Sequence, residues 1–280
     1  MEEKIITAED LAAFRQYLIK KEAGKETVEK YLRCAGNLKN WLSGRALSKE
    51  LAIEWKENLR RKGLAPATVN GYIAAANALF LCLGAEIRIR ALKIQRKIFT
   101  DKNRELTKEE YERLISAAMD KGNVRLALLF ETICATGIRV SEVRYITLEA
   151  AASGRADISL KGKIRTILIP HDLCRKLRKY AKKNGIKAGE IFLSKTGRPL
   201  SRKQIWADMK SVCEEAHVEP EKVFPHNLRH LFARTFYRIT KDVVKLADVL
   251  GHSNISTTRI YLISTEKEHR SALERLKLVC

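Results

Sequence analysis

Apolar residues recur at helical spacing through the first 84 residues of the chain, and a glycine follows each run. The four runs extend from about Thr7 to Gly24, Glu26 to Gly44, Ser48 to Gly63 and Pro66 to Gly84. Threonine three positions before Asp10 fits a capping box, and proline is favoured in the first turn of a helix. The pattern therefore predicts four helices that form a small all-helical domain.

The next stretch, EIRIRALKIQRKIFTDKNREL, breaks the helical pattern and is rich in lysine and arginine. A chain of 280 residues exceeds the usual size of one domain, so two domains are expected. We therefore predict a helical domain at residues 1–87, a basic linker at 88–104 and a second domain at 105–280.

The second half combines helices with one small sheet. Helical patterns occupy about 107–119, 123–135, 139–149, 171–183, 201–216, 225–238, 240–249, 254–262 and 265–278. Between them, RADISLKGKIRTILIP alternates apolar and polar residues around a central glycine, which is typical of a β-hairpin, and EIFLS fits a short strand. The expected fold class is mainly α, with a small antiparallel sheet in the C-terminal domain.

The charge of the chain indicates a polyanionic partner. Lys and Arg number 54 against 33 Asp and Glu, a net charge of +21. Such an excess suits phosphate contacts that release counterions, although charge alone leaves DNA, RNA and a membrane surface open. No apolar run approaches the roughly 18 residues of a membrane span, and the N-terminus lacks a signal-peptide layout. A cytoplasmic location without membrane contact is expected.

Neither cysteines nor histidines predict a metal site. The six cysteines form no C-x-x-C pair, so free thiols are expected. His226 and His230 have the spacing of a helical metal pair, but no third ligand stands near them in sequence. We expect neither a metal nor another cofactor.

Three short segments carry residues suited to cleaving a phosphodiester without a metal. In PHNLRH, His226 and Arg229 share one face near a helix N-terminus, where an anion is favoured. ATGIRVSEV contains Arg139, and LGHSNISTTRIY contains His252 and Tyr261. Guanidinium groups bind phosphate through paired hydrogen bonds, a tyrosine can attack phosphorus, and histidine can transfer protons. Each of these residues taken alone is more often structural than catalytic.

Taken in this order, the three segments closely resemble the tyrosine recombinase or phage integrase family, which includes the Xer recombinases. The first half, with GLAPATVNGYIAAANALFLCLG, resembles the SAM-like core-binding domain of that family. The resemblance implies that Tyr261 is the nucleophile and forms a 3′-phosphotyrosine. It implies that Arg139 and Arg229 bind the non-bridging oxygens. His226 and His252 are implied to hydrogen-bond the phosphate, and His226 to help take the tyrosine proton.

The resemblance also implies a lysine in the hairpin that protonates the leaving 5′ oxygen. Many members of the family read K-G-x-K-x-R, whereas this chain reads KGKIR, one residue shorter. Lys161, which precedes the turn glycine, is our choice, and Lys163 is the alternative. Glu142 is interpreted as a structural hydrogen-bonding residue, and Tyr237 as a core or surface residue.

The function implied is site-specific recombination of double-stranded DNA, as integration, excision, inversion or dimer resolution, including at a mobile element. The implied partner state is a monomer in free solution and a homotetramer on paired DNA sites. The sequence leaves open whether a directionality factor is needed. The alternatives are DNA relaxation of the type IB topoisomerase kind and a catalytically silent DNA-binding regulator. Candidates for groove contact in the first domain are Lys25, Lys30, Arg33, Lys39, Asn70, Tyr72 and Asn77.

Overall fold

The computed structural model describes residues 4–94, 104–160, 163–194, 196–261, 270–271 and 274–276. The chain divides into two compact units, Met1–Arg96 and Lys97–Cys280. The break lies inside the segment predicted as a linker. Each unit has its own buried core.

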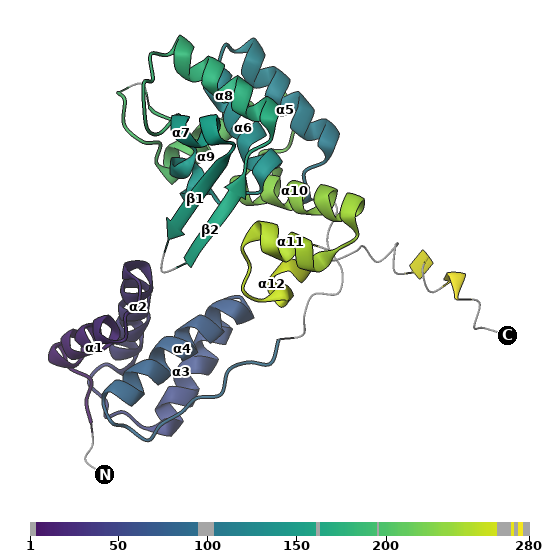
Figure 1. The fold of residues 1–280 in the computed structure, drawn as a ribbon. Helices are drawn as coiled ribbons and strands as arrows, with labels where there is room; N and C mark the ends of the chain where they lie inside the picture. Colours follow the sequence, from purple (N-terminus) through teal and green to yellow (C-terminus); the bar gives the residue numbers. More distant parts are fainter. Residues whose placement is uncertain are drawn as a thin grey trace. The chain divides into compact units, whose positions relative to one another are not determined.

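Unit 1 contains, in its described part, the helices α1 (Ala8–Lys20), α2 (Lys25–Leu42), α3 (Lys49–Arg61) and α4 (Pro66–Cys82) (Figure 1). The residues expected at the starts of these helices form helix caps. Thr7 and Asp10 form a capping box at α1, and the Ser48 hydroxyl caps α3. The fully buried indole of Trp55 packs in the core and donates its N–H to Asn37 Oδ1 at 3.1 Å.

The chain after α4 remains part of unit 1 as far as it is described there. Asn77 exchanges two hydrogen bonds with the backbone of Ile89, and Asn70 exchanges two with the backbone of Leu92. The buried side chain of Ile89 joins the core of the unit. Both amide groups are engaged by this strap, which argues against the groove contact predicted for Asn70 and Asn77.

Unit 2 is built around a buried helix. Its described elements are α5 (Lys108–Asp120), α6 (Val124–Thr136), the 3₁₀ helix η2 (Val140–Tyr145), α7 (Leu148–Ser153), β1 (Arg155–Leu160), β2 (Lys163–Leu168), α8 (His171–Lys183), α9 (Arg202–Lys210), the 3₁₀ helix η3 (Pro220–Lys222), α10 (Pro225–Thr240), α11 (Val243–Leu250) and α12 (Ile255–Arg259). Helix α6 packs against α5, α8 and α10, which explains why its apolar positions are not confined to one face.

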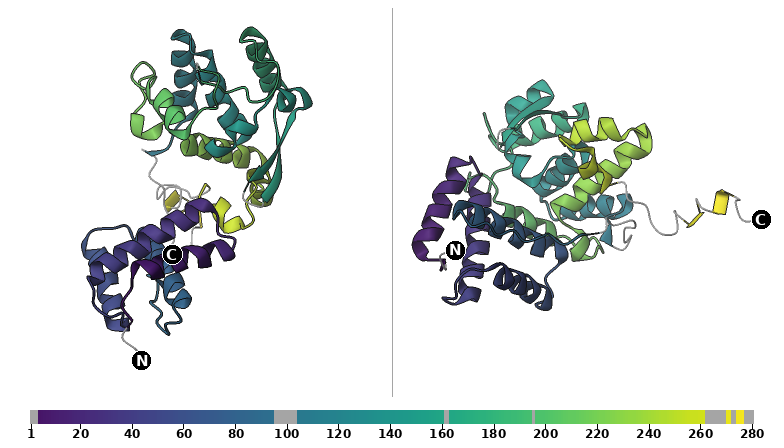
Figure 2. Two further views of the ribbon diagram at one scale, coloured as in Figure 1. Left: turned by 90° about the vertical axis from the view of Figure 1, so that its left-hand side faces the viewer. Right: turned by 90° about the horizontal axis from the view of Figure 1, so that it is seen from below.

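The predicted hairpin is present. Strands β1 and β2 pair antiparallel, with Ile158 opposite Arg165 and Leu160 opposite Lys163, and β1 lies beside η2 and α7. The mainly helical fold with one small antiparallel sheet is confirmed (Figures 1 and 2). No described helix has the length and apolar character required to cross a membrane.

Two predicted elements are wrong. The helix expected over 139–149 is split into η2 and α7, because Thr147 adopts an extended conformation and its hydroxyl caps α7. The strand expected at EIFLS consists only of isolated bridges, Thr147 with Glu190 and Leu193 with Pro199. Most of the predicted C-terminal helix at 265–278 lies outside the described residues.

Candidate active site

The centre of the site in unit 2 is the guanidinium group of Arg229, on the first turns of α10. Pro225 starts this helix, and Arg229 is 2% exposed. Its N–H groups donate to the backbone oxygen of Gly137, to that of Leu250 at 2.9 Å and to His252 Nε2 at 2.9 Å. Arg229 therefore joins the end of α6, the end of α11 and the α11–α12 loop.

Burial lowers the pKa of Arg229 to about 10, against a partly opposing effect of Tyr261. The guanidinium group consequently keeps its positive charge at neutral pH, where a buried cation favours an anionic ligand.

Tyr261 lies next to this arginine. Its hydroxyl oxygen accepts a hydrogen bond from Arg229 Nε at 3.3 Å, and the residue is only 4% exposed. Leu246 and Leu250 of α11 and Ala233 of α10 form its apolar surroundings. The structure thus brings together the tyrosine and the arginine that the sequence placed 32 positions apart.

Three histidine rings surround the ring of Tyr261. Centroid distances are 4.4 Å to His230, 5.7 Å to His226 and 5.8 Å to His252, with His252 stacked at 11°. Sequence reasoning considered His230 only as a metal ligand and missed its contact with Tyr261. The i,i+4 spacing that suggested a metal pair also places both histidines on the face of α10 that meets Tyr261. Among the described residues, no group of three or more His, Cys, Asp or Glu side chains could hold a metal ion.

The hydrogen bonds of His252 define its tautomer. Arginine can only donate, so Nε2 of His252 accepts from Arg229 and Nδ1 carries the proton. Nδ1 then donates to the hydroxyl of the fully buried Thr258 at 2.8 Å. Thr258 is a positioning residue that the sequence analysis did not identify, since its spacing from His252 in a short loop–helix segment carries no distinctive signal.

The other two histidines are shifted towards the neutral form. Burial, assisted by the positive charges of Arg229 and Arg139, lowers the pKa of His226. Burial and the neighbouring His226 and Arg229 lower the pKa of His230 to about 4. His226 is thus suited to accept a proton at neutral pH, and His230 stays uncharged there.

The carboxylate of Glu142 binds two further arginines of the site, Arg139 and Arg165. This 3% exposed carboxylate accepts from the backbone N–H of Arg139 at 2.7 Å, from the Arg139 guanidinium at 3.0 Å and from Arg165 on β2. The structural role predicted for Glu142 agrees with these contacts. The Arg139 side chain is 41% exposed, so its charge is available to a ligand that approaches from solvent.

Arg165 of the hairpin also belongs to the site, a role that its position in the sequence does not indicate. It reaches from β2 to the α11–α12 region, where it donates to Val249 O at 3.3 Å and passes against Gly251. A methyl group on Gly251 would lie 2.4 Å from Arg165 Cδ. Glycine is therefore required at 251 by close approach as well as by its φ of 62°.

The predicted general acid cannot be placed. Lys161 lies outside the described residues, and for Lys163 only the backbone in β2 is described. Arg139, Arg229, His226, His252 and Tyr261 are the candidate residues that the structure brings together.

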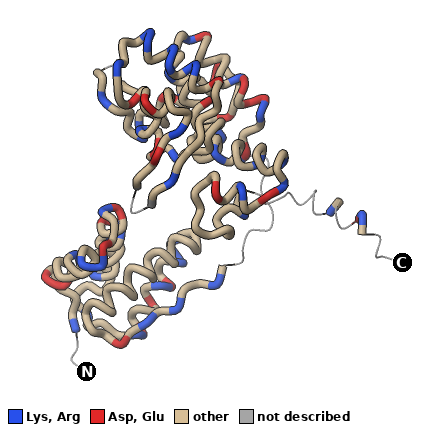
Figure 3. Tube along the Cα trace, viewed as in Figure 1, with Lys and Arg blue, Asp and Glu red and all other residues tan. Residues whose placement is uncertain are grey.

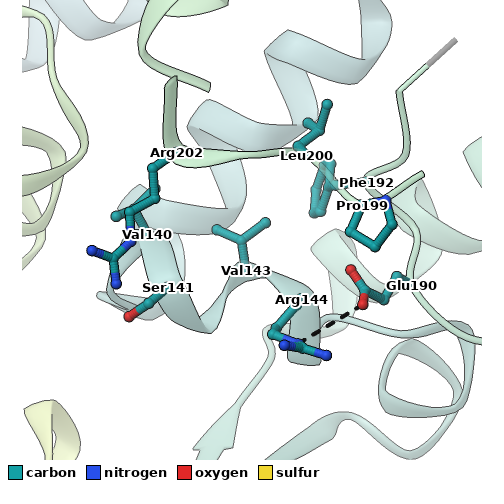
Figure 4. A pocket seen from close by; sticks show the side chains of 9 residues that line it. All are labelled: Val140, Ser141, Val143, Arg144, Glu190, Phe192, Pro199, Leu200 and Arg202. Atoms are coloured by element: carbon teal, nitrogen blue, oxygen red, sulfur yellow. Dashed lines mark ion pairs between the residues drawn. The ribbon is translucent and has the colours of Figure 1, made fainter. Parts of the chain in front are cut away.

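The 3₁₀ helix η2 also borders a cavity that none of the candidate active-site residues lines. A cavity of about 340 Å³ is lined by Val140, Val143 and Arg144 of η2 and by Phe192, Pro199 and Leu200. Figure 4 shows these side chains, with Arg144 directed to Glu190. An ion pair of 3.9 Å between Arg144 and Glu190 lies at its edge. The short helix η2, which contains Glu142 and directly follows Arg139, therefore packs between the candidate active site and this cavity.

Residues 104–268 match the model of the phage integrase family. The chain belongs to the phage integrase family. The tyrosine recombinase XerA of Pyrococcus furiosus is 29% identical over 286 residues, covering 100% of this chain and 98% of the relative. The tyrosine recombinase XerD of Halalkalibacterium halodurans is 26% identical and covers 81% of each chain.

Solved structures show the same fold. XerH site-specific recombinase bound to a palindromic difH substrate superposes with a TM-score of 0.74 at 18% identity, covering 98% of this chain and 90% of that one. The Tn1549 transposon integrase with transposon right end DNA gives 0.71 at 18% identity, covering 95% and 99%. The prediction that the chain belongs to this family and is a tyrosine site-specific DNA recombinase is confirmed. The family match and the sequence relatives, which are tyrosine recombinases, do not favour the topoisomerase and regulator alternatives.

Proposed function

We propose that this member of the phage integrase family exchanges strands of double-stranded DNA through a 3′-phosphotyrosine at Tyr261. The observation that carries this proposal is the hydrogen bond from the buried, charged Arg229 to the Tyr261 hydroxyl, with three imidazole rings around it. A nucleophile held against a phosphate-binding cation is what in-line attack on phosphorus requires.

In the cleavage step, Tyr261 Oη forms a bond to phosphorus and the bond from phosphorus to the 5′ oxygen breaks. His226 takes the tyrosine proton, which its lowered pKa permits at neutral pH. The hairpin lysine, Lys161 or Lys163, protonates the departing 5′ oxygen. Attack by a 5′ hydroxyl of the partner strand then reverses the step, so one phosphodiester replaces another without an external energy source.

Arg139 and Arg229 bind the non-bridging oxygens and stabilise their growing negative charge. When phosphate occupies the site, the N–H of Arg229 that now reaches His252 turns to a phosphate oxygen. His252 Nε2 then loses its donor and contacts the phosphate itself. Donation from Nε2 requires a change of tautomer or protonation, and the Thr258 hydroxyl can accept from or donate to Nδ1 in either case.

We further propose the wider context implied by the sequence. The protein acts in the cytoplasm as a monomer that assembles into a homotetramer on paired sites, at a mobile element or a chromosomal site. Inverted repeats beside the gene would favour inversion, and neighbouring phage or transposon genes would favour integration.

The experiment that tests the chemistry is to capture the intermediate on nicked duplexes, in which loss of a short strand traps the cleaved product. Nuclease and protease digestion followed by mass spectrometry should locate one nucleotide-bearing peptide, and that peptide should contain Tyr261. A modified peptide from any other part of the chain, or adduct formation that chelator abolishes and zinc restores, would overturn the proposal.

A further inference from the structure

Helix α8 presents an almost wholly basic outer face. One side of the helix is buried through Leu173, Cys174, Leu177 and Ala181. The exposed side carries, over two and a half turns, the cations Arg175, Lys176, Arg178, Lys179, Lys182 and Lys183. Exposed Lys187 follows in the next loop.

Two of these cations are neutralised and the others are not. Arg175 pairs with Asp172 at 2.9 Å, and Lys176 pairs with Glu131 of α6 at 2.5 Å. Within the described part of the chain, Arg178, Lys179 and Lys182 have no carboxylate partner, and the same holds for Lys183. The face therefore has positive charge available for an external anion.

The stability of α8 as a helix explains only some of the cations on its exposed face. Cations in the last turn interact favourably with the helix dipole, which accounts for Lys182 and Lys183. Arg178 and Lys179 precede that turn. Both are exposed and, among the described residues, neither forms an ion pair, so the helix dipole and ion pairing do not account for their charge.

The face is also separate from the candidate active site. Helix α8 packs on α6 and α7, whereas Tyr261 packs on α10 and α11. Figures 1 and 2 show α8 at one end of unit 2 and α12 at the other, and Figure 3 shows Lys and Arg repeated along α8. DNA bound at Tyr261 and a ligand on α8 would thus occupy different surfaces of the same unit.

We propose that the outer face of α8 binds the sugar-phosphate backbone of a second DNA duplex while the first occupies the active site. This inference rests on the proposed function, since it takes the partner to be duplex DNA. From Arg175 to Lys183 the helix rises about 12 Å, which spans two or three phosphates of one strand. Contacts of this kind carry no sequence information, so the surface would hold any duplex.

The test is a bridging assay with two random-sequence duplexes, one immobilised on beads and one fluorescent. Wild-type protein should retain the fluorescent duplex on the beads. The double variant Lys179→Gln/Lys182→Gln should retain about tenfold less, and the slope of log retention against log salt should fall by about 2. Glutamine keeps the helix propensity of lysine, so the fold of α8 should persist.

The control is Lys108→Gln/Lys121→Gln, which removes the same number of cations from the two ends of α5, where each lysine is paired with a carboxylate, Lys108 with Glu112 and Lys121 with Glu215. This control should bridge like wild type. Binding of a single duplex, measured by fluorescence anisotropy, should be within about twofold of wild type for both variants.

Three results would overturn the inference. Bridging that persists in the α8 variant, or falls equally in the control, removes any special role from this face. Loss of single-duplex binding together with bridging in the α8 variant makes α8 part of one continuous DNA surface. Wild-type protein that binds no duplex at all overturns the proposed function as well, and that result is distinct from the other two.

Discussion

The hydroxyl oxygen of Tyr261 accepts a hydrogen bond from Nε of Arg229 at 3.3 Å, while Tyr261 itself is 4% exposed. The proposed nucleophile is therefore held by a proposed phosphate-binding cation and sheltered from solvent. A scissile phosphate must replace the hydroxyl as a partner of Arg229, which places the phosphorus close to the tyrosine oxygen.

Replacing Tyr261 by phenylalanine should abolish covalent capture of DNA, because only the attacking oxygen is removed. Affinity should change by less than about fivefold, which corresponds to about 1 kcal/mol, the net contribution of one typical hydrogen bond. Nicked duplexes followed by denaturing electrophoresis measure the adduct, and filter binding measures affinity. Tyr237→Phe on α10 is the control and should form adduct normally, because phenylalanine keeps the ring that packs beside the apolar cluster around Tyr261 and under Lys241. An adduct that persists in Tyr261→Phe removes Tyr261 from its role.

Arginine-to-lysine substitutions at 139 and 229 should separate catalysis from stability. Each should slow cleavage by about 10²-fold or more, because lysine cannot bind two phosphate oxygens in parallel. Arg229→Lys should also lower the free energy of unfolding by about 2–4 kcal/mol, since it leaves buried acceptors at Gly137 and Leu250 unpaired.

The half-exposed Arg139 provides the internal comparison. Arg139→Lys should change the free energy of unfolding by less than about 1 kcal/mol, because the half-exposed lysine can still pair with Glu142, which keeps its contacts with Arg165 and the backbone N–H of residue 139. Urea unfolding and single-turnover cleavage of the same preparations check both quantities. Equal stability losses in the two variants would contradict the contrast in burial.

Much of this site could be predicted from the sequence because its residues come from short, distinctive segments. The helix start at Pro225 places His226 and Arg229 on one face, and the glycines before Arg139 and His252 end helices. The contacts of Arg165, Thr258 and His230 depend on how β2, α10 and α12 pack together. Local periodicity carries no information about such packing, so these roles could not be predicted.

The differences between the predictions and the structure have the same physical origin. Asn70 and Asn77 look available on a helix face, but the strap that follows α4 occupies both amides. The helical pattern over 139–149 was interrupted by Thr147, whose side chain competes for the backbone and starts a new helix.

Gly251→Ala should impair both folding and cleavage. Gly251 ends α11 with φ of 62°, a region that costs alanine roughly 1–2 kcal/mol, and its new methyl group would displace Arg165 from Glu142. Gly154→Ala is a closely matched control, since Gly154 ends α7 with φ of 77° and has open space around the same position. Unfolding should show the larger loss for Gly251→Ala, and cleavage should fall only in that variant. Similar losses of cleavage in both would rule out the contact with Arg165 as the cause.

His230 should make stability depend on pH. Its pKa in the folded state, about 4, lies below the ordinary value of 6.5, so the unfolded chain binds more protons between these values. The stabilisation from neutral His230 is complete above about pH 6.5 and is lost as the pH falls towards 4. Its size is at most about 3 kcal/mol.

His230→Phe keeps an aromatic ring beside Tyr261 and cannot be protonated. The difference in unfolding free energy between wild type and this variant should therefore shrink or reverse in favour of phenylalanine as the pH falls from 7 to 4. Urea titrations at several pH values measure it. A difference that stays constant over this range would show that His230 is not the group that titrates.

The identity of the general acid can be decided by removing the need for it. If Lys161 protonates the 5′ oxygen, Lys161→Ala should cleave an ordinary phosphodiester about 10²-fold or more slowly, the usual contribution of a positioned acid. A substrate with sulfur at the 5′ bridging position has a leaving group that departs without a proton. Such a substrate should restore cleavage by Lys161→Ala to near the wild-type rate, while Lys163→Ala, which retains the acid, should gain little from it. Rescue of Lys163→Ala instead would assign the acid to Lys163, and rescue of neither would place the acid outside the hairpin. Tyr261→Phe is the necessary control, because a better leaving group cannot replace a missing nucleophile.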